Sequence, residues 1–399
     1  MSNTQKHTKS NVPNLRFPGF EGEWLDCTFG DCCTGFDYGM NAASTQFDGE
    51  HKYIRITDID ERTSEYMADG VVSPDAEIDE HYRVKENDIL FARTGASTGK
   101  TYLFNPKDGR LYFAGFLIRM NVSPQNNSRF VFYQTQTRRY KKWVQIMSMR
   151  SGQPGINSQE YSSYRCFLPK AEEQRKIAGL LTLIDQRISI QNKVIEDLIC
   201  IKESILNRMM NEKDESCRIV SLGEITEIIS RRNKEKIDYP MYSVTNEKGF
   251  VPQEEQFEDR EMVGEDISAY KIVHKEEIAY NPARINVGSI AQYTGDSPCM
   301  ISSLYVCIKA KKGIDSNWLI QVLKSEQLVK KYNLFAEGGV RLYLFYPNFS
   351  RIKISLPSPK KQSRISEMIE KLEKKIALEQ SILSRYLNTK AALLRDLFV

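Results

Sequence analysis

Two short segments carry residue types that could bind a phosphate or act on a DNA base. Gly95-Ala-Ser-Thr-Gly-Lys100-Thr101 follows a strand-like run and resembles a phosphate-binding P-loop. A P-loop has four residues between its first glycine and the Gly-Lys pair, whereas this segment has three. The favoured interpretation is a glycine-rich loop whose backbone, with Lys100, approaches a phosphate of another ligand. A surface turn without a ligand is the alternative.

The second segment, Asn281-Pro282-Ala283-Arg284, resembles the Asn-Pro-Pro-aromatic motif of amino-group DNA methyltransferases, but it lacks the second proline and the aromatic residue. No FxGxG-like cofactor loop occurs elsewhere, so intrinsic methylation is not expected. The four histidines are too dispersed for a metal site or a catalytic triad: His7, His51, His81 and His274. We therefore predict a binding protein without catalytic residues, cofactor or metal of its own.

Composition is ordinary for a globular chain of two or three domains, with 41% hydrophobic and 27% charged residues and a net charge of +4. The eight cysteines form no CxxC pair, which predicts reduced structural thiols. No apolar run of 18 residues and no signal-peptide core occur, so we expect a cytoplasmic chain without a membrane span.

Basic residues gather in short clusters that could neutralise DNA phosphates or simply form solvated faces. Arg138-Arg139-Tyr140-Lys141-Lys142-Trp143 is the densest of them, and Arg231–Lys234 and Lys309–Lys312 lie later in the chain.

Two long stretches repeat each other, and each ends in a helical segment that starts after a proline, Pro169 or Pro357, 188 residues apart. The expected segments are an N-terminal tail and docking segment (1–20), a first mixed block (21–170), a first helix (171–212), a second block (213–358) and a second helix (359–399). Short β-rich runs and a helix recur in the same order in both blocks.

Apolar residues recur in each helical segment at alternating steps of four and three, the pattern of a coiled-coil seam. We expect the two helices to pack together, because each stripe alone would expose a large apolar face. A parallel pair would bring Lys202 beside Lys390, so an antiparallel pair is favoured. The predicted fold is α+β: two tandem mixed blocks separated by an antiparallel, pseudo-two-fold symmetric helix pair.

Such a pair could place two different reading elements on one DNA duplex. Arginine and lysine can pair with guanine, and asparagine and glutamine with adenine. The loops that differ between blocks, with the basic clusters, supply the predicted DNA contacts: Arg93, Thr94, Ser97, Lys100, Arg138, Lys141, Gln153, Asn157, Tyr280, Arg284, Asn286, Lys311 and Arg341.

The order block, long helix, block, long helix resembles the specificity subunit of a type I restriction-modification system. The opening Pro13-Asn-Leu15-Arg16-Phe17-Pro18-Gly19-Phe20, followed by Trp24, is similar to the start of many such subunits. Pro169 with Glu173-Gln174-Arg175 resembles the start of the family's spacer helix, and Pro357 with Lys361-Gln362 repeats it with a lysine in place of the acid. Tyr280–Gly288 looks like a target-recognition segment.

The resemblance implies that each block reads one half of a bipartite double-stranded DNA target and that the helix pair sets the gap between the halves. It also implies two methyltransferase subunits and additional translocase/nuclease subunits as partners, with S-adenosylmethionine, ATP and Mg²⁺ bound by those partners. The predicted partner-docking residues are Phe17, Phe20, Trp24, Ile188, Ile195, Ile376 and Leu383.

Two other interpretations remain open at this point: a coiled-coil adaptor, or a nucleotide-binding protein without DNA specificity. Binding of random duplex DNA at low salt would argue against the first, and a failure to bind nucleotide would argue against the second.

Overall fold

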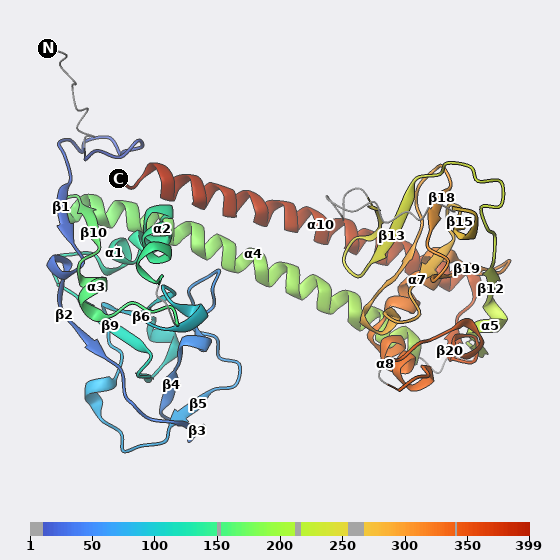
Figure 1. Ribbon diagram of the computed structural model, residues 1–399, viewed down its shortest axis with the longest axis horizontal. Coiled ribbons are helices and arrows are strands. Elements are labelled where there is room, and N and C mark those ends of the chain that lie inside the picture. Colours follow the sequence, from blue (N-terminus) through green and yellow to red (C-terminus); the bar gives the residue numbers. More distant parts are fainter. Residues whose placement is uncertain (1–10, 150–152, 212–216, 254–266, 340) are drawn as a thin grey trace, which may run out of the picture. The chain divides into compact units, whose positions relative to one another are not determined.

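The computed structural model describes residues 11–149, 153–211, 217–253, 267–339 and 341–399, so the first ten residues of the expected N-terminal tail lie outside the described residues. The chain divides into two compact units (Figure 1). The first unit is Met1–Gln191 with Ile382–Val399, and the second is Asn192–Ser381. Each unit contains one mixed α/β block and part of each long helix, so the predicted α+β tandem architecture is confirmed.

The long helices are α4 (Ala171–Asn211, 41 residues) and α10 (Pro359–Asp396, 38 residues). At 1.5 Å per residue each is roughly 60 Å long. Glu172 and Glu173 lie in the first turn of α4, where carboxylates are stabilised by the helix dipole. The first turn of α10 contains no acidic residue, and Lys361 stands at the position of Glu173.

The two helices run antiparallel in each unit, as predicted. In the first unit, Lys390 Nζ lies 2.7 Å from Asp185 Oδ1. In the second unit, Lys202 Nζ lies 2.6 Å from Glu373 Oε1. Asp185 and Glu373 are equivalent residues of the two repeats, and so are the two lysines. Each seam lysine therefore faces a carboxylate of the other helix, which removes the like-charge conflict of a parallel pair.

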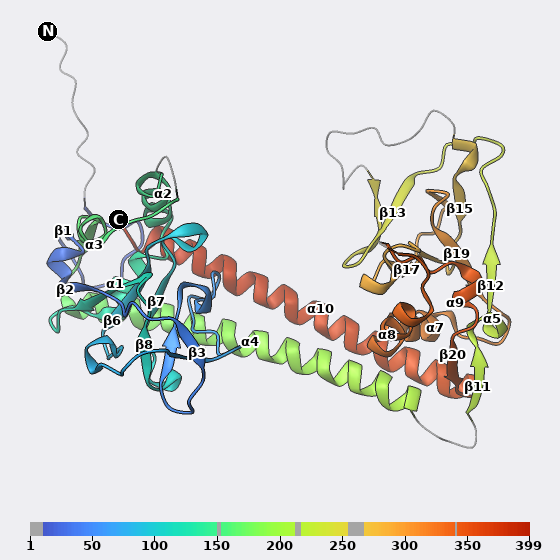
Figure 2. The same cartoon turned by 60° about the horizontal axis from the view of Figure 1, so that its bottom comes forward.

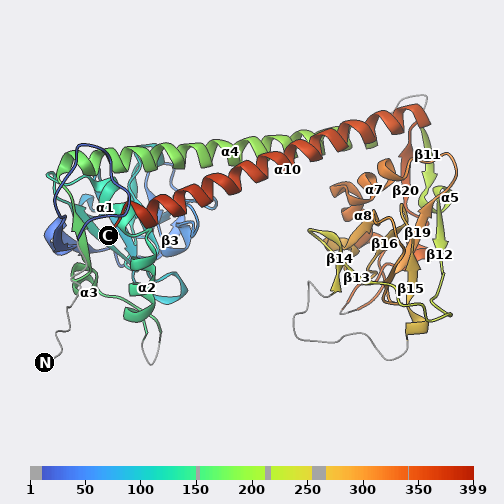
Figure 3. The same ribbon diagram turned by 90° about the horizontal axis from the view of Figure 1, so that it is seen from above.

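Apolar side chains from α4 and from α10 or the residues after it share a core in each unit. In the first unit Ile177 and Leu181 of α4 pack in one core with Leu397 and Phe398, just after α10. Figure 3 shows α4 beginning and α10 ending within this unit. In the second unit Leu206 of α4 packs with Ile365 and Ile369 of α10. Full burial of one such side chain contributes about 1.5–3 kcal/mol.

Each block is built on the same four-stranded antiparallel sheet. In the first unit the strand order is β2 (Cys33–Tyr38), β9 (Leu117–Val122), β6 (Asp88–Ala92), β7 (Thr101–Leu103). In the second unit it is β12 (Thr226–Ile229), β19 (Val306–Ala310), β16 (Ile278–Tyr280), β17 (Ile290–Gln292). The shared connectivity shows that the sequence repeat is also a structural repeat.

A second layer of strands differs more between the repeats. The first unit has the pairs β3 (Ser44–Gln46) with β5 (Val72–Pro74) and β4 (Lys52–Ile54) with β8 (Leu111–Phe113). The second unit has one sheet, β14 (Gly249–Pro252), β13 (Met241–Thr245), β18 (Cys299–Ile301), β15 (Lys271–Val273). Both contain one parallel pair, β4 with β8 and β13 with β18.

A two-stranded antiparallel ladder lies between each block and its long helix. β1 (Leu25–Thr28) pairs with β10 (Arg165–Leu168), and β11 (Arg218–Ser221) pairs with β20 (Lys353–Leu356). β10 and β20 continue through Pro169 and Pro357 into α4 and α10. The proline ends the strand and restricts the residue before it to extended backbone, so that a helix can start at once.

The short helices are α1 (Ser128–Gln134), α2 (Arg138–Met147) and α3 (Ser158–Ser162) in the first unit, and α5 (Leu222–Ile225), α7 (Ser316–Lys324), α8 (Glu326–Phe335) and α9 (Tyr346–Phe349) in the second. Asparagine, aspartate, serine or threonine side chains cap the start of several of them. α7 packs against β17 and β19 (Figure 2). In the part of the chain that is described, no helix is long and apolar enough to cross a membrane.

One buried glutamine ties each block to its long helix. Gln174 Oε1 accepts the N–H of Asn127, which precedes α1, at 2.9 Å, and its Nε2 donates to Pro169 O at 3.0 Å. Gln362 repeats both bonds with Asp315 N–H and Pro357 O, each at 2.9 Å. The two glutamines are 2% and 1% exposed, so their amides have no access to water as a substitute partner.

Replacing Gln174 by methionine should lower the free energy of unfolding by about 2–4 kcal/mol, because the Pro169 carbonyl would lose its partner in a buried position and the Asn127 N–H in a partly buried one. Urea denaturation of the chain and of the variant would measure the change. Gln186→Met, at an exposed position of the same helix, is the control and should change stability by less than about 0.5 kcal/mol. Equal effects of the two variants on stability would contradict the proposed role of the Gln174 hydrogen bonds.

Candidate nucleic-acid interface

In the first unit, two loops predicted to read bases lie against each other. The N–H of Ile156 donates to Arg93 O at 2.9 Å, and the N–H of Gly95 donates to Pro154 O at 2.9 Å. These bonds join the segment after β6 to the segment before α3, although the two are some sixty residues apart in the chain. The structure therefore brings together Arg93, Thr94, Ser97, Gln153 and Asn157.

Arg93 and Tyr38 form a pair of stacked side chains where β6 and β2 end. The Arg93 guanidinium carbon lies 5.0 Å from the centroid of the Tyr38 ring, a cation–π arrangement. Ser158 donates to the Tyr38 hydroxyl from its N–H at 3.2 Å and contacts it with Oγ at 3.1 Å. Partial burial raises the pKa of Tyr38, but the Ser158 hydrogen bonds and the Arg93 charge outweigh that effect and lower it overall.

The sequence analysis missed Tyr38. Its ring is 42% exposed and belongs to the last residue of β2, at the sheet edge where β6 also ends. The sequence offered one hint of its role: Tyr38 is an aromatic residue at the end of a strand, and it contacts a loop that differs between the two repeats.

The glycines of the Gly95–Lys100 segment serve turn geometry and packing. Gly95 and Gly99 have φ of +68° and +89°, and a Cβ on Gly99 would lie 2.4 Å from Val144 of α2. The N–H groups of Gly95, Thr98, Gly99 and Lys100 all donate to carbonyls within this unit. Those four amides already have partners, so a phosphate contact by this segment would fall to its other groups, including Lys100, and the predicted approach to a phosphate stays a prediction. Lys100 Nζ lies 3.9 Å from Glu61 Oε2.

The basic cluster of α2 separates into a packed side and an exposed side. Tyr140 is buried and donates its hydroxyl to Gly99 O at 3.2 Å, so α2 lies next to the glycine turn. Arg139 stacks on Phe167 at 4.6 Å. Arg138 and Lys141 are exposed, as a phosphate contact requires.

The second unit repeats the loop pairing with different side chains. The N–H of Leu344 donates to Pro282 O at 3.0 Å, the equivalent of the Ile156–Arg93 bond. Glu337 and Tyr343 exchange two backbone bonds of 2.9 and 2.8 Å, which close the loop between α8 and α9. The loop after β16 thus lies beside the loop that contains Arg341.

Exposed cationic and aromatic side chains gather on these two loops. Arg284 and Arg341 are exposed. Tyr343 and Phe345 stack with centroids 5.9 Å apart and an interplanar angle of 3°, and they are 37% and 55% exposed. The Asn286 amide donates to Asn333 Oδ1 at 3.0 Å. Phe345 was not predicted as a contact residue. The sequence shows it only as an aromatic residue in the loop that contains Arg341.

Two of the predicted DNA contacts lie elsewhere. Tyr280 is fully buried, with its ring stacked on Phe349 at 5.1 Å, so its assignment as a DNA contact is wrong. Lys311 is exposed but donates to Gly223 O at 2.8 Å. It follows the end of β19 opposite Val306, the residue paired with Tyr280. Lys311 therefore lies at the opposite end of the strands from the loop that follows β16.

Several predicted partner-docking residues form the chain's own core. Trp24 is 2% exposed and packs edge-to-face on Phe130 and Phe398, so it offers no free docking surface. Ile188 and Ile195 are each 8% exposed, and their assignment as docking residues is likewise wrong.

The other docking residues are only partly buried. Phe17 packs against the core that contains Trp24, and Phe20 lies under Lys176, whose Nζ is 5.7 Å from the ring centroid. Ile376 and Leu383 are of intermediate exposure. On α4 the exposed aliphatic side chains are different ones: Leu183 and Ile190, at 60% and 59%, and Ile199 and Ile201, at 43% and 48%.

Comparison with known proteins identifies the family. The type I restriction modification DNA specificity domain matches residues 39–198 and 214–385, which together make up most of the chain. The chain therefore belongs to this family and contains its domain twice. Membership makes it a DNA-recognition component of a restriction-modification system, and not the component that catalyses methylation or cleavage.

Individual relatives agree with this assignment. The type I restriction enzyme MjaVIII specificity subunit of Methanocaldococcus jannaschii is 22% identical over 357 residues, which is 80% of each chain. The crystal structure of the S subunit from M. genitalium shares the fold with a TM-score of 0.61 at 14% identity, over 97% of this chain and 99% of that one. A chain from a structure describing complex assembly and conformational transition of the type I R-M system has a TM-score of 0.55 at 15% identity, over 96% and 98%.

The placement of Tyr280 and Arg284 predicts opposite outcomes for two nearby substitutions. Arg284→Ala should weaken binding to the cognate duplex by about 1–3 kcal/mol, the cost of losing one good base or phosphate contact. Tyr280→Phe should leave binding unchanged and slightly raise stability, because the hydroxyl is buried without a partner. Fluorescence anisotropy with the cognate duplex would measure the first effect and urea denaturation the second. Loss of binding in Tyr280→Phe would contradict the placement.

Proposed function

We propose that each unit reads one half of a bipartite double-stranded DNA target through its two paired loops. One observation carries this proposal. Both repeats join the same two loops by the same backbone hydrogen bond, Ile156 to Arg93 and Leu344 to Pro282, while the side chains on the loops differ. Two domains that bind different half-sites need the same loop backbone to hold the contacts in place and different side chains to contact different bases.

The first unit offers Arg93, Gln153 and Asn157 with Tyr38, and the second offers Arg284, Asn286 and Arg341 with the Tyr343–Phe345 stack. Arginine donates twice to guanine, and the amides of glutamine and asparagine pair with adenine. Arg138 and Lys141 on α2 contact phosphates, which fixes the position of the unit without reading bases.

The helix pair sets the gap between the half-sites, because the Asp185–Lys390 and Lys202–Glu373 ion pairs fix the register of α4 against α10. The same helices dock two methyltransferase subunits, which bind S-adenosylmethionine, and translocase/nuclease subunits add ATP- and Mg²⁺-dependent cleavage. The chain itself acts in the cytoplasm, where its DNA target is. The exposed Leu183 and Ile190 of α4 are better suited than the buried Ile188 to contact such a partner.

Methylome mapping by single-molecule sequencing, in a host that expresses this chain with its partner subunits, tests the proposal. The expected result is a bipartite motif with an unspecific gap. Exchanging the block of the second unit for that of a relative should change the bases of one half-site only. A continuous motif, or a change in both half-sites after the exchange, would sink the proposal.

Lengthening both helices by one heptad should widen the gap. One insertion belongs between Asp185 and Lys202 in α4 and a matching one between Glu373 and Lys390 in α10, so that both ion pairs remain. Seven residues add about 10 Å of helix, or about three base pairs at 3.4 Å each. Binding to duplexes with a series of gap lengths would show the shift, and an unchanged optimum would mean that the helices do not set the gap.

Salt dependence separates phosphate contacts from base contacts. Lys141→Ala should reduce the slope of log affinity against log salt by about one unit and weaken cognate and random duplex equally. Arg93→Ala should weaken the cognate duplex more than the random one. Titrations at four or five salt concentrations measure both, and identical behaviour of the two variants would contradict the division of roles.

A further inference from the structure

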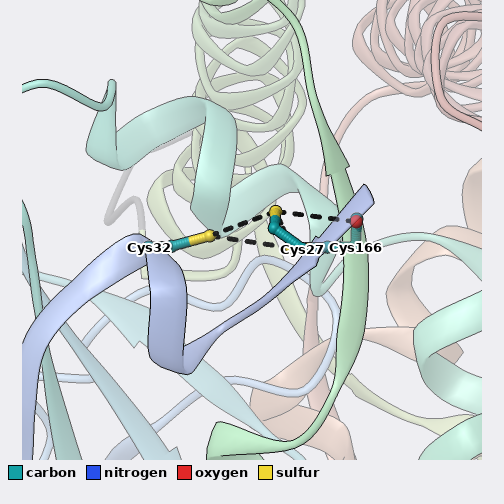
Figure 4. A group of neighbouring side chains, drawn as sticks. All are labelled: Cys27, Cys32 and Cys166. Atoms are coloured by element: carbon teal, nitrogen blue, oxygen red, sulfur yellow. Dashed lines mark hydrogen bonds between the residues drawn. The ribbon is translucent and has the colours of Figure 1, made fainter. Parts of the chain in front are cut away.

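Three cysteine thiols from separate elements meet in the first unit (Figure 4). Cys27 lies in β1, Cys32 ends the short 3-10 helix Gly30–Cys32, and Cys166 lies in β10. Their Sγ atoms are 3.5 Å (Cys27–Cys166), 3.7 Å (Cys32–Cys166) and 3.9 Å (Cys27–Cys32) apart. The residues are 9%, 0% and 1% exposed. From the sequence these cysteines were predicted to be reduced structural thiols.

These separations fit the geometry of a thiolate metal site. A tetrahedral zinc ion with Zn–S bonds of about 2.3 Å holds its sulphurs about 3.8 Å apart. All three measured distances lie close to that value, and each thiol contacts the other two; Figure 4 shows the three residues with dashed lines between them. Binding would require little movement of the backbone, because β1 and β10 already hold Cys27 and Cys166 as direct cross-strand neighbours.

The second repeat shows that packing alone does not require thiols here. Val220 and Ile354 form the cross-strand pair that corresponds to Cys27 and Cys166, and Ile225 precedes β12 as Cys32 precedes β2. Those three aliphatic residues are 2–6% exposed in the core of the second unit. The same place in the fold is therefore filled by aliphatic side chains in the second repeat and by three thiols in the first.

The electrostatics of the cluster favour a cation. Hydrogen bonds from the Cys166 and Cys32 thiols lower the pKa of Cys27. Donation to Cys27 and Cys32 raises the pKa of Cys166. The nearby carboxylates of Asp31 and Asp26 add negative charge beside Cys27, and a bound cation would offset that charge. Binding must displace the remaining thiol protons, so affinity should rise with pH.

We propose that Cys27, Cys32 and Cys166 bind one thiophilic metal ion, zinc being the ion whose tetrahedral sulphur spacing they match. The fourth position is left to water or to a backbone carbonyl, since Thr28 O lies 3.1 Å from the Cys32 sulphur and Cys166 O lies 3.6 Å from the Cys27 sulphur. The ion would link β1, the 3-10 helix and β10, and so fasten the N-terminal segment to the strand that continues into α4. This replaces the expectation that the chain binds no metal.

Metal titration of the full chain tests the site. The chain is stripped with a chelator under reducing conditions and titrated with Co²⁺, then with Zn²⁺. The expected result is one equivalent of cobalt with a thiolate-to-cobalt charge-transfer band, displaced by zinc, and a melting temperature that rises with zinc. Protection of three thiols from alkylation by bound zinc is a second readout.

The second repeat supplies the matched variant. Cys27→Val, Cys32→Ile and Cys166→Ile together copy its aliphatic cluster and should abolish the cobalt band while circular dichroism stays unchanged. Cys200→Ala, at an exposed position of α4, is the control and should retain full binding. Should the triple variant not fold, Cys27→Ser alone should weaken zinc binding about a hundredfold or more, since even outer-shell changes cost 10–100-fold.

Two results would overturn the proposal. One is an equal metal content in the parent chain and in a folded variant that lacks these thiols. The other is a Cys27–Cys166 disulfide in the chain isolated under reducing conditions, because that bond would remove two of the three donors.

Discussion

In each repeat, the buried amide of one glutamine fixes the mixed block to the start of its long helix. Gln174 and Gln362 lie inside the start of a long helix, and each binds the carbonyl of the preceding proline and the N-cap residue of a block helix, α1 or α7. The glutamine amides and the proline carbonyls are buried, so these bonds cannot be exchanged for solvent at little cost. The block is thereby held to its helix at a fixed place, and the sheet and its loops follow from that attachment.

The two repeats share the same backbone arrangement around this attachment. They differ in the side chains that their loops expose. The four-stranded sheet, the ladder that leads into the long helix and the hydrogen bond between the two loops recur with the same connectivity. Arg93 on Tyr38 in one unit and the Tyr343–Phe345 stack in the other do not recur. A frame with its own apolar core can tolerate such changes, because the loops contribute little to burial.

The features that were predictable from sequence are those set by long periodic patterns. The helices, their antiparallel direction and the mixed blocks could be predicted, since a seam of some forty residues and the Lys202 and Lys390 positions leave few arrangements. The loops that we propose as base readers lie side by side in each unit, but the pairing of Arg93 with Tyr38 was not predicted. Single residues were harder to place.

Tyr280 and Trp24 were both expected to be accessible and are buried, each for its own reason. The strand that contains Tyr280 is buried on both faces, so it has no polar-apolar alternation that would reveal an inward side chain. An aromatic residue in an N-terminal segment looks alike whether it packs on its own chain or on a partner. The three clustered thiols could not be found either, because strand pairing, and not sequence spacing, brings Cys166 to Cys27.

Arg16 adds an asymmetry that the repeat itself does not have. Its guanidinium binds both oxygens of Glu173, at 2.8 and 2.9 Å, and thus clamps the N-terminal segment onto the first turn of α4. The corresponding residue at the start of α10 is Lys361, whose charge would repel an arginine. The duplicated molecule therefore has a distinguishable head and tail, because the charge at position 361 does not allow the same ion pair at the start of the other long helix.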